Sequence, residues 1–296
     1  MSIAPLNYSD AKTVCATLDC AANLLLQNES RFGSTHHLPT TGTVWVSGDL
    51  HDNPFNYAKI VKLADLDNPT NHVVLQELIH PTHNPETLDL SYRMLVRVAH
   101  LIGRYPAQVH PILANHELSQ ATDRLITKGG AELVGKFIHG VEHVFGKSSN
   151  DVLKAIHGFI RSMPLAVLSE NGLMCCHSLP NEHEMPQFDT NIINRKLNKK
   201  DISAKEGSAT KMVWGREHSQ AQYDALANLW NVKLFCLGHA WVPAGITVLG
   251  TNVVAINSDH DQGVVLPVDL STIQTASNVL QFAVKLSSVS MEVHEF

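Results

Sequence analysis

The sequence predicts an α/β protein: one domain with a mixed β-sheet core and flanking helices. First, short apolar runs alternate with longer stretches whose apolar residues recur at helical spacing, the pattern of consecutive βαβ units. Second, the Asn171-Gly172 pair between two apolar runs predicts a hairpin, so an antiparallel region follows the parallel one. Third, 296 residues that are 44% hydrophobic are enough for a sizeable buried core.

The first half of the chain contains the alternating units. Apolar spacing after a Ser/Asp start predicts a helix over residues 9–28, followed by a polar loop over 28–42. Strands are then predicted at 43–48, 72–76 and 109–113, and helices at 56–66 and 87–105. Residues 1–40 are therefore expected to form an N-terminal helix and loop, and residues 41–296 the main domain.

The second half contains two helices, the hairpin and a series of short strands. The helices are predicted at 131–146 and 150–163, the hairpin at 164–177, and the strands at 232–238, 245–250, 252–258 and 263–270. Between them, residues 181–211 are polar and rich in lysine without a clear period, which predicts a surface loop or insertion. In a compact domain such a segment often lies on the substrate side.

The overall composition gives no indication of nucleic-acid binding. The net charge is -6 and the pI about 6.3, so the basic footprint that nucleic acids require is missing. Five cysteines, odd in number and without CxxC spacing, predict neither a disulfide framework nor a zinc ribbon. Without a secretory signal or an apolar run of about 18 residues, the sequence predicts a cytoplasmic protein with no membrane partner.

Several predicted strands end on residues that bind metals or exchange protons. The residues at five strand ends are Asp49 and His51; Glu77; Asn115, His116 and Glu117; His177; and His239. In layered α/β folds the carboxyl ends of strands converge, and the loops there carry ligands. Each residue alone also fits an ordinary cap or turn, whereas the series indicates a shared site.

The donor set favours a catalytic metal site over structural zinc. It combines carboxylate and amide oxygens with imidazole nitrogens and contains no thiolate, which suits Mn²⁺, Fe or Zn²⁺ in an open site. A carboxylate in the middle of the set can bridge two ions. Such a pair of ions stabilises both the attacking and the leaving oxygen of a phosphoryl displacement.

The ordered motifs resemble those of the calcineurin-like metallophosphoesterases, particularly their serine/threonine protein phosphatase branch. GDLH at residues 48–51 is similar to the first block of that family, GDxHG, and ANHE at 114–117 to the third, GNHE. The stretch that ends at His177 resembles the fourth block, and Gly238-His239 the fifth. The match runs in order over about residues 43–270, and Trp241 in place of a second histidine favours the phosphatase branch.

This resemblance implies two facing mixed β-sheets flanked by helices, a four-layer sandwich with two divalent metal ions (Mn, Fe or Zn) at the sheet edge. The ligands that it implies are Asp49 and His51 for the first metal, and Asn115, His177 and His239 for the second. Glu77 stands where the carboxylate that bridges the metals is expected.

The resemblance also implies a mechanism and a phosphorylated substrate. A hydroxide shared by the two metals would attack phosphorus, and His116 would protonate the leaving oxygen. Arg216 resembles an arginine that clamps the phosphate, a task that suits a planar guanidinium.

The second block departs from the family pattern GDxxDRG and reads QELIHPT at residues 76–82. Glu77 replaces the bridging aspartate, His80 the acid that orients the catalytic histidine, and Pro81 an arginine that binds phosphate. Glutamate adds one C–C bond, or roughly 1.5 Å of reach. The candidates to orient the histidine instead are Glu117, Asp52 and His80.

The leading prediction is therefore a phosphoric-ester hydrolase, a phosphomonoesterase of the protein phosphatase type that acts on a phosphoprotein or a small phosphoester. One alternative is hydrolysis of nucleotides or dinucleoside polyphosphates. The other is a degenerate homologue that binds metal or phosphate without turnover. The changes at His80 and Pro81 favour the degenerate homologue, and the retained His116 opposes it.

Overall fold

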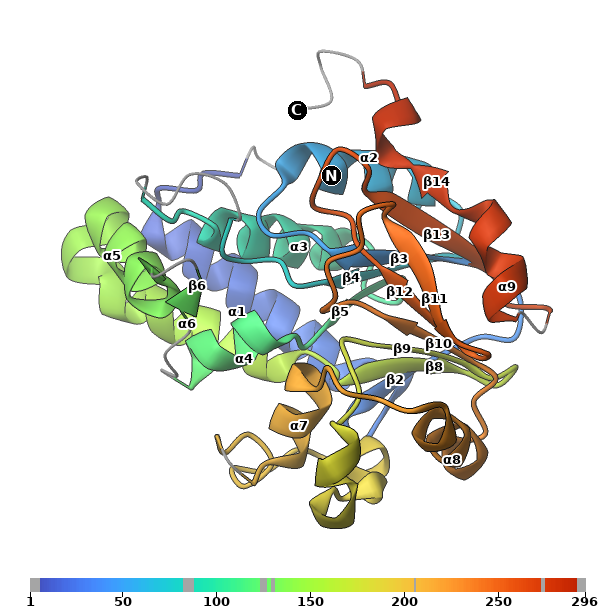
Figure 1. The fold of residues 1–296 in the computed structure, drawn as a ribbon. Coiled ribbons are helices and arrows are strands. Elements are labelled where there is room, and N and C mark those ends of the chain that lie inside the picture. The colour runs from blue at the N-terminus through green and yellow to red at the C-terminus, as the bar shows by residue number, and fades with distance from the viewer. Residues whose placement is uncertain are drawn as a thin grey trace.

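Two facing β-sheets form the core of the protein in its computed structural model, with helices on the outside (Figure 1). The structure describes residues 6–81, 88–122, 127–128, 131–204, 206–272 and 275–291. The predicted architecture of two mixed sheets with flanking helices is confirmed. None of the described helices is both long and apolar enough to cross a membrane.

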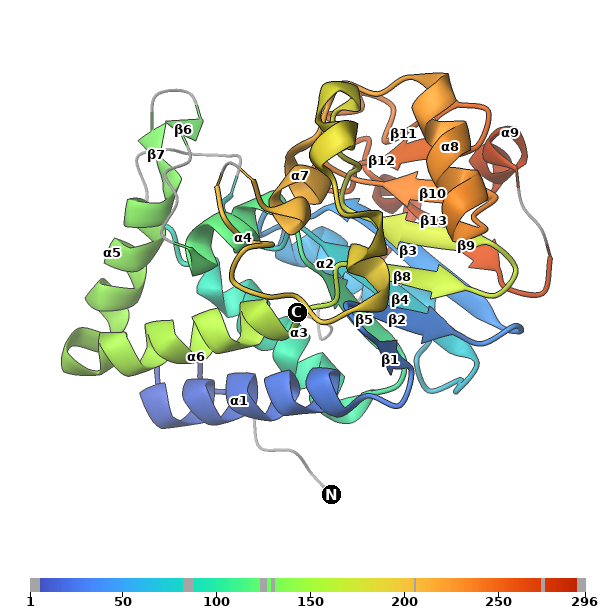
Figure 2. The same ribbon diagram turned by 90° about the horizontal axis from the view of Figure 1, so that it is seen from below.

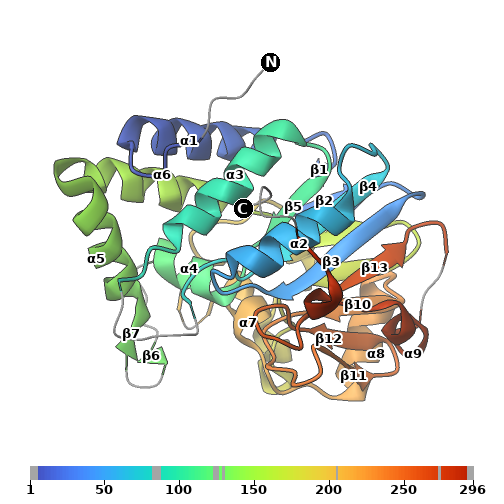
Figure 3. The same ribbon diagram turned by 90° about the horizontal axis from the view of Figure 1, so that it is seen from above.

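The five-stranded sheet contains the parallel units predicted from the first half of the chain. Its strands, in order across the sheet, are β14 (Val284–Lys285), β13 (Val264–Asp269), β3 (Thr43–Asp49), β4 (Asn71–Gln76) and β5 (Val109–Ile112). Strands β3, β4 and β5 are parallel and are connected by α2 (Pro54–Ala64) and α3 (Tyr92–Arg104). Both helices lie over the outer face of this sheet (Figure 3). The carboxyl ends of the three strands therefore meet at one edge.

The seven-stranded sheet contains the hairpin and most strands of the second half. Its strands, in order, are β1 (Arg31–Phe32), β2 (Thr35–Leu38), β8 (Ala166–Ser169), β9 (Leu173–Cys176), β10 (Leu234–Leu237), β12 (Val253–Ile256) and β11 (Ile246–Gly250). The predicted hairpin at Asn171-Gly172 is confirmed as β8 and β9, with Gly172 at a φ of 94°. Strands β9 and β10 are parallel, so their carboxyl ends are adjacent too.

The remaining helices cover the flanks of the two sheets (Figures 1 and 2). They are α1 (Ala11–Gln27), α4 (Asn115–Ala121), α5 (Leu133–Phe145), α6 (Ser149–Ser162), α7 (Ser208–Trp214), α8 (Gln220–Trp230) and α9 (Ala276–Val279). Helix α1 packs on α6 and α3, which gives the predicted N-terminal helix an apolar partner on two sides. A small hairpin of β6 (Thr127–Lys128) and β7 (Ala131–Glu132) precedes α5.

Two segments differ from the sequence-based expectation. Residues 28–42, predicted as a loop, contain β1 and β2, and β2 pairs in parallel with β8. This strand was missed because two of its three buried residues, Thr35 and His36, are polar and only Leu38 is apolar, so the sequence shows no apolar alternation. The N-terminal segment thus supplies a strand to the larger sheet.

The polar insertion is folded and is not a plain surface loop. It contains two 3-10 helices, Glu182–Gln187 and Thr190–Asn194, and α7 begins before its predicted end. The Arg195 guanidinium forms ion pairs of 2.6 Å with both Asp189 and Asp201. A planar guanidinium can bind two carboxylates at once, so these ion pairs hold part of the insertion together. The buried Phe188, Ile192 and Ile193 attach it to the core, but they do not recur with a regular period in the sequence.

Three histidines from both sheets meet at one end of the core between the sheets. His110 Nδ1 lies 3.1 Å from His36 Nδ1, and His110 Nε2 lies 3.2 Å from His72 Nδ1. Each is in register with a valine of the core between the sheets, so all three point inward. Burial lowers the pKa of His36 to about 3 and also lowers those of His72 and His110. The native state therefore keeps this cluster neutral.

We expect the protein to lose stability in mild acid because of this cluster. Below pH 6.5, the ordinary histidine pKa, these histidines bind protons in the unfolded chain. In the native state they stay unprotonated, because burial and the positive charge of Arg31 lower the pKa of His36. Each such histidine lowers the free energy of unfolding by about 1.4 kcal/mol per pH unit. Urea unfolding between pH 7.5 and 4.5 measures the slope. The slope should become shallower in His110→Gln and stay unchanged in His139→Gln, which alters an exposed histidine; equal slopes in both variants would refute the assignment.

Candidate metal centre

The predicted site residues converge where the strands of both sheets end. They are Asp49, the last residue of β3; His51, in the loop after β3; Glu77, which follows β4; Asn115, His116 and Glu117, at the start of α4; His177, which follows β9; and His239, after β10. All of them are buried. The two sheets thus present one polar edge, as the sequence predicts.

The backbone at this edge is unusually strained. Of the seven described non-glycine residues with a positive φ, five lie here, namely His51, Asp52, Glu77, His80 and His239. The left-handed region is unfavourable for side chains with a Cβ and persists only where the surroundings enforce it. The N–H groups of Leu50 and His51 donate to the Glu77 carbonyl at 3.1 and 2.8 Å and so hold two of these turns together.

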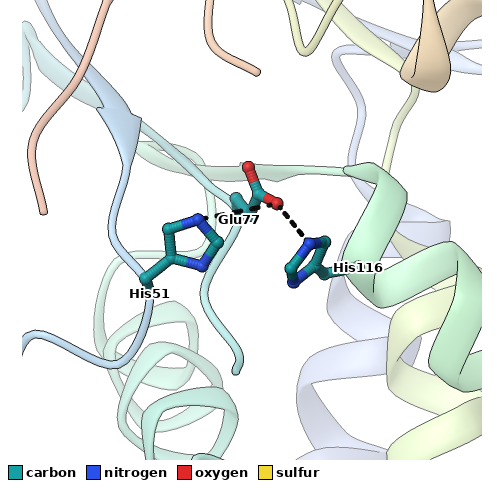
Figure 4. A group of neighbouring side chains, drawn as sticks. All are labelled: His51, Glu77 and His116. Atoms are coloured by element: carbon teal, nitrogen blue, oxygen red, sulfur yellow. Dashed lines mark ion pairs between the residues drawn. The ribbon is translucent and has the colours of Figure 1, made fainter. Parts of the chain in front are cut away.

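Glu77 lies at the centre of the site. Its Oε1 is 3.3 Å from His116 Nε2 and 3.8 Å from His51 Nε2, and Figure 4 shows both rings facing this carboxylate. Its Oε2 is 3.4 Å from His177 Nε2. Glu77 therefore belongs to two groups of potential metal ligands. It forms one group with His51 and His116 and the other with His177 and His239, and within each group the ligand atoms lie within 4.8 Å of one another.

The hydrogen bonds of two histidines leave a nitrogen lone pair directed at the centre. His51 Nδ1 lies 3.0 Å from the His80 carbonyl, which can only accept, so His51 donates from Nδ1 and its Nε2 carries a lone pair. His177 Nδ1 lies 3.0 Å from Gln76 Oε1 and donates in the same way. Such outer hydrogen bonds are how proteins orient metal-binding imidazoles.

The atoms that could bind the second metal all carry lone pairs and can accept hydrogen bonds. Asn115 Oδ1 lies 2.7 Å from His177 Nε2, and His239 Nε2 is buried without a hydrogen-bond partner among the described residues. Burial lowers the pKa of His177 well below its usual value and that of His239 to about 3, so both rings are neutral. Converging acceptors repel one another unless a cation lies between them. The donor set therefore fits a divalent cation.

Asp49 and Glu117 are held by backbone N–H groups. Asp49 Oδ1 accepts from the N–H of His239 at 2.9 Å. Glu117 Oε1 accepts from Leu78 and Ile79 at 2.7 and 3.2 Å and so fixes the turn after Glu77. Burial raises the pKa of Glu117 to about 7. These contacts give Glu117 a place in supporting the site, and its catalytic role stays a prediction.

Arg216 is exposed and lies beside the candidate ligand His239. Its Nη1 donates to the carbonyl of His239 at 2.8 Å, which anchors one edge of the guanidinium beside a candidate ligand. The other N–H groups of a guanidinium fork remain able to bind an anion. The structure thus places this guanidinium beside a candidate metal ligand, and its role as a phosphate clamp stays a prediction.

Two polar residues of the site were missed in the sequence. Asp89 Oδ2 accepts from His80 Nδ1 at 2.8 Å, and the His80 ring lies 5.2 Å from that of His116. Gln76 donates to the Ser47 carbonyl at 2.7 Å while its Oε1 accepts from His177. Gln76 occupies the place of the glycine that opens the family's second block, and this departure could have marked Gln76 as a site residue. The sequence around Asp89 contains no comparable indication.

Gly238 shows how closely the loops of the site approach one another. A Cβ at this position would lie 2.4 Å from Asp49 Oδ1 and 2.5 Å from Gln76 Oε1. A side chain here would displace Asp49 Oδ1 from the His239 N–H and Gln76 Oε1 from His177, so glycine preserves both contacts. This explains the Gly-His pair at the end of β10.

Solved structures with the same fold include two phosphatases. A protein serine/threonine phosphatase from Saccharomyces cerevisiae aligns with a TM-score of 0.64 and 14% identity over 88% of this chain and 83% of that chain. A cold-active protein-tyrosine phosphatase of a Shewanella species aligns with a TM-score of 0.56 and 14% identity over 81% of this chain and 82% of that chain. No protein-family model and no curated protein matches the sequence. The chain thus has the same fold as these two phosphatases, and its strand-end motifs resemble those of the calcineurin-like metallophosphoesterases.

Proposed function

We propose that this protein is a metal-dependent phosphoric-ester hydrolase, a phosphomonoesterase of the protein phosphatase type with two divalent metal ions. The observation that carries the proposal is the shared carboxylate of Glu77, with two donor groups on its two oxygens. The groups combine imidazole nitrogen with oxygen, the donor set of Mn²⁺, Fe and Zn²⁺ sites. Two phosphatases with the same fold support this reaction class.

The chain's own residues supply orientation and charge for such a reaction. When bound, the two cations would supply Lewis-acid activation of the phosphoryl group and of the attacking water. His51 and His177 would hold the metals through Nε2, because their Nδ1 atoms donate to His80 and Gln76. Arg216 would bind phosphate oxygens while its Nη1 stays on the His239 carbonyl.

A cavity at the far end of α4 from Asn115 supports a substrate larger than phosphate. About 860 Å³ of space lies between α4, the end of α6 and the insertion. Its apolar lining includes Leu113, Leu118, Ala121, Ile160, Leu197 and Ile202. None of the candidate metal ligands lines this cavity, but α4 connects it to Asn115 and His116, so a peptide that extended from the cavity along α4 would reach the candidate metal site. A phosphoprotein therefore fits better than a free small phosphoester.

The experiment that tests the function is metal reconstitution with a phosphate assay. Purified protein is stripped with a chelator, reloaded separately with Mn²⁺, Fe²⁺ or Zn²⁺, and assayed with nitrophenyl phosphate and with phosphopeptides. We expect about two bound ions per chain and metal-dependent release of phosphate. Metal binding without hydrolysis of any ester or anhydride would instead identify a non-catalytic binding protein.

Arg216→Ala should weaken substrate binding without removing the metals. Loss of one charge-assisted clamp on phosphate is expected to lower kcat/KM roughly 10-fold to 100-fold, mostly through KM. Arg216→Lys keeps the charge and loses the fork, so its activity should be intermediate. Steady-state kinetics together with metal analysis measure both effects. Unchanged kinetics in Arg216→Ala would show that the guanidinium does not touch substrate.

A further inference from the structure

Trp241 is an exposed tryptophan close to the candidate metal centre. It is 73% exposed, whereas Trp45, Trp214 and Trp230 are all half-buried. Trp241 follows the candidate ligand His239 by two residues, so the Cα atoms of the two lie within about 7.6 Å of each other. Tryptophan is highly buried on average, and exposed indole rings are enriched where proteins bind partners. The position of this ring therefore suggests a role in binding.

Backbone hydrogen bonds hold the loop that carries Trp241. The N–H of Ala240 donates to the Gly238 carbonyl at 2.7 Å, and the N–H of Gly245 donates to the Val242 carbonyl at 2.9 Å. Val242, the residue after the tryptophan, is buried. The indole is therefore exposed on an ordered backbone, so this loop loses little conformational entropy when a ligand packs on the ring.

His260 lies beside the indole and comes from the next loop. The centroids of the two rings are 6.2 Å apart, with an interplanar angle of 44°. His260 Nδ1 accepts from the N–H of Gln262 at 3.1 Å, so its proton is on Nε2, which donates to the Val242 carbonyl at 3.0 Å. Because both nitrogens have partners, this imidazole is a fixed neighbour of the indole.

The two loops meet at the edge of the metal centre. They follow β10 and β12, which are parallel neighbours, so both loops begin at the same edge of the sheet. In the second loop, the N–H of Ser258 donates to the Asp49 carbonyl at 3.1 Å. Beside the first loop, Arg216 donates to the His239 carbonyl at 2.8 Å. A phosphate ester bound at the metals would thus have a cation and an exposed aromatic ring nearby.

We propose that Trp241 determines substrate specificity by packing on an aromatic ring that is joined to the phosphate through its ester oxygen. The preferred substrates are then aryl phosphate monoesters, the class that includes phosphotyrosine. The inference rests on the proposed function, because the metal centre must hold the phosphate. In phosphotyrosine a flat ring begins at the atom next to the ester oxygen, whereas phosphoserine has a single methylene there. An indole can stack on the ring but gains little from the methylene.

Kinetics with matched phosphopeptides test the preference. Wild-type protein and variants, loaded with the most activating metal, are assayed on peptides of one sequence that carry phosphotyrosine or phosphoserine, and on adenosine monophosphate. We expect Trp241→Ala to lower kcat/KM on the phosphotyrosine peptide roughly 3-fold to 10-fold, mostly through KM, and on the phosphoserine peptide less than about 2-fold. Trp241→Phe keeps an aromatic ring and should restore most of the loss. Leu229→Ala, which changes an exposed apolar residue of α8, is the control and should match wild type.

Tryptophan fluorescence tests the contact without turnover. Benzylphosphonate and propylphosphonate have no ester bond to hydrolyse, and each is added to the metal-loaded protein while quenching by acrylamide is measured. We expect benzylphosphonate, and not propylphosphonate, to shield the wild-type protein from acrylamide, and neither compound to shield Trp241→Phe. Equal losses on the two peptides, a larger loss on adenosine monophosphate or an unshielded indole would overturn the inference. If no ester is hydrolysed, the proposed function fails, while the shielding still decides whether Trp241 contacts the aromatic ring.

Discussion

Glu77→Gln should abolish the metal centre with little change in the fold. Glutamine has the same shape, but it removes the negative charge and places an NH₂ group against imidazole lone pairs. Since one carboxylate serves both donor groups, we expect both ions to bind weakly and hydrolysis to fall at least about 1,000-fold. Metal content by mass spectrometry and kcat/KM on nitrophenyl phosphate measure the two effects. Glu142→Gln, which changes an exposed glutamate of α5, is the control.

Glu77→Asp separates the charge of this residue from its reach. Aspartate keeps the carboxylate and shortens it by one carbon, so its oxygens retreat from His116 and His51. We expect metal binding to persist more strongly than in Glu77→Gln, with the first metal the weaker one. If Glu77→Gln keeps two ions and full activity, Glu77 is not the bridge and the site must be assembled around another carboxylate.

The parts of the fold that the sequence could predict depend on hydrophobic pattern and turn chemistry. Strands β3, β4 and β5 are short apolar runs with helices between them, and Asn171-Gly172 marks the hairpin. Strand β2 could not be found because two of its three buried residues, Thr35 and His36, are polar. Helix α8 was missed as well. Its buried residues are Gln222, Tyr223, Leu226 and Ala227, while both of its ends are partly or fully exposed, so its apolar stripe is short.

The site could be predicted in outline, because ligands at strand ends keep their order along the chain. Glu77, His177 and His239 were expected together and are together. The hydrogen bonds that orient those ligands join residues that are far apart in the sequence. Gln76 reaches His177, which is 101 residues away in the chain, and Asp49 accepts from His239 across 190 residues. No local pattern encodes such pairs.

Gln76 decides which nitrogen of His177 carries the proton and which faces the candidate metal site. Its amide nitrogen must face the Ser47 carbonyl, because a carbonyl can only accept, and this fixes Oε1 toward His177 Nδ1. His177 must then donate from Nδ1, so Nε2 keeps its lone pair for the metal. In Gln76→Leu the hydrogen bond from His177 Nδ1 is lost. His177 can then carry its proton on Nε2 and donate to Asn115 Oδ1, which lies 2.7 Å away.

We therefore expect Gln76→Leu to weaken metal binding roughly 10-fold to 100-fold, the usual effect of removing such an orienting partner. Competition with a coloured chelator measures the affinity, and ¹⁵N chemical shifts of the histidine rings report which nitrogen of His177 carries the proton. Gln76→Glu still accepts from Nδ1 and should retain most of the affinity, even though it loses the bond to Ser47. If Gln76→Leu binds metal as tightly as wild type, His177 is oriented by its packing alone. An Nε2–H tautomer in the metal-free variant, and not in wild type, would show that the hydrogen bond sets the ligand.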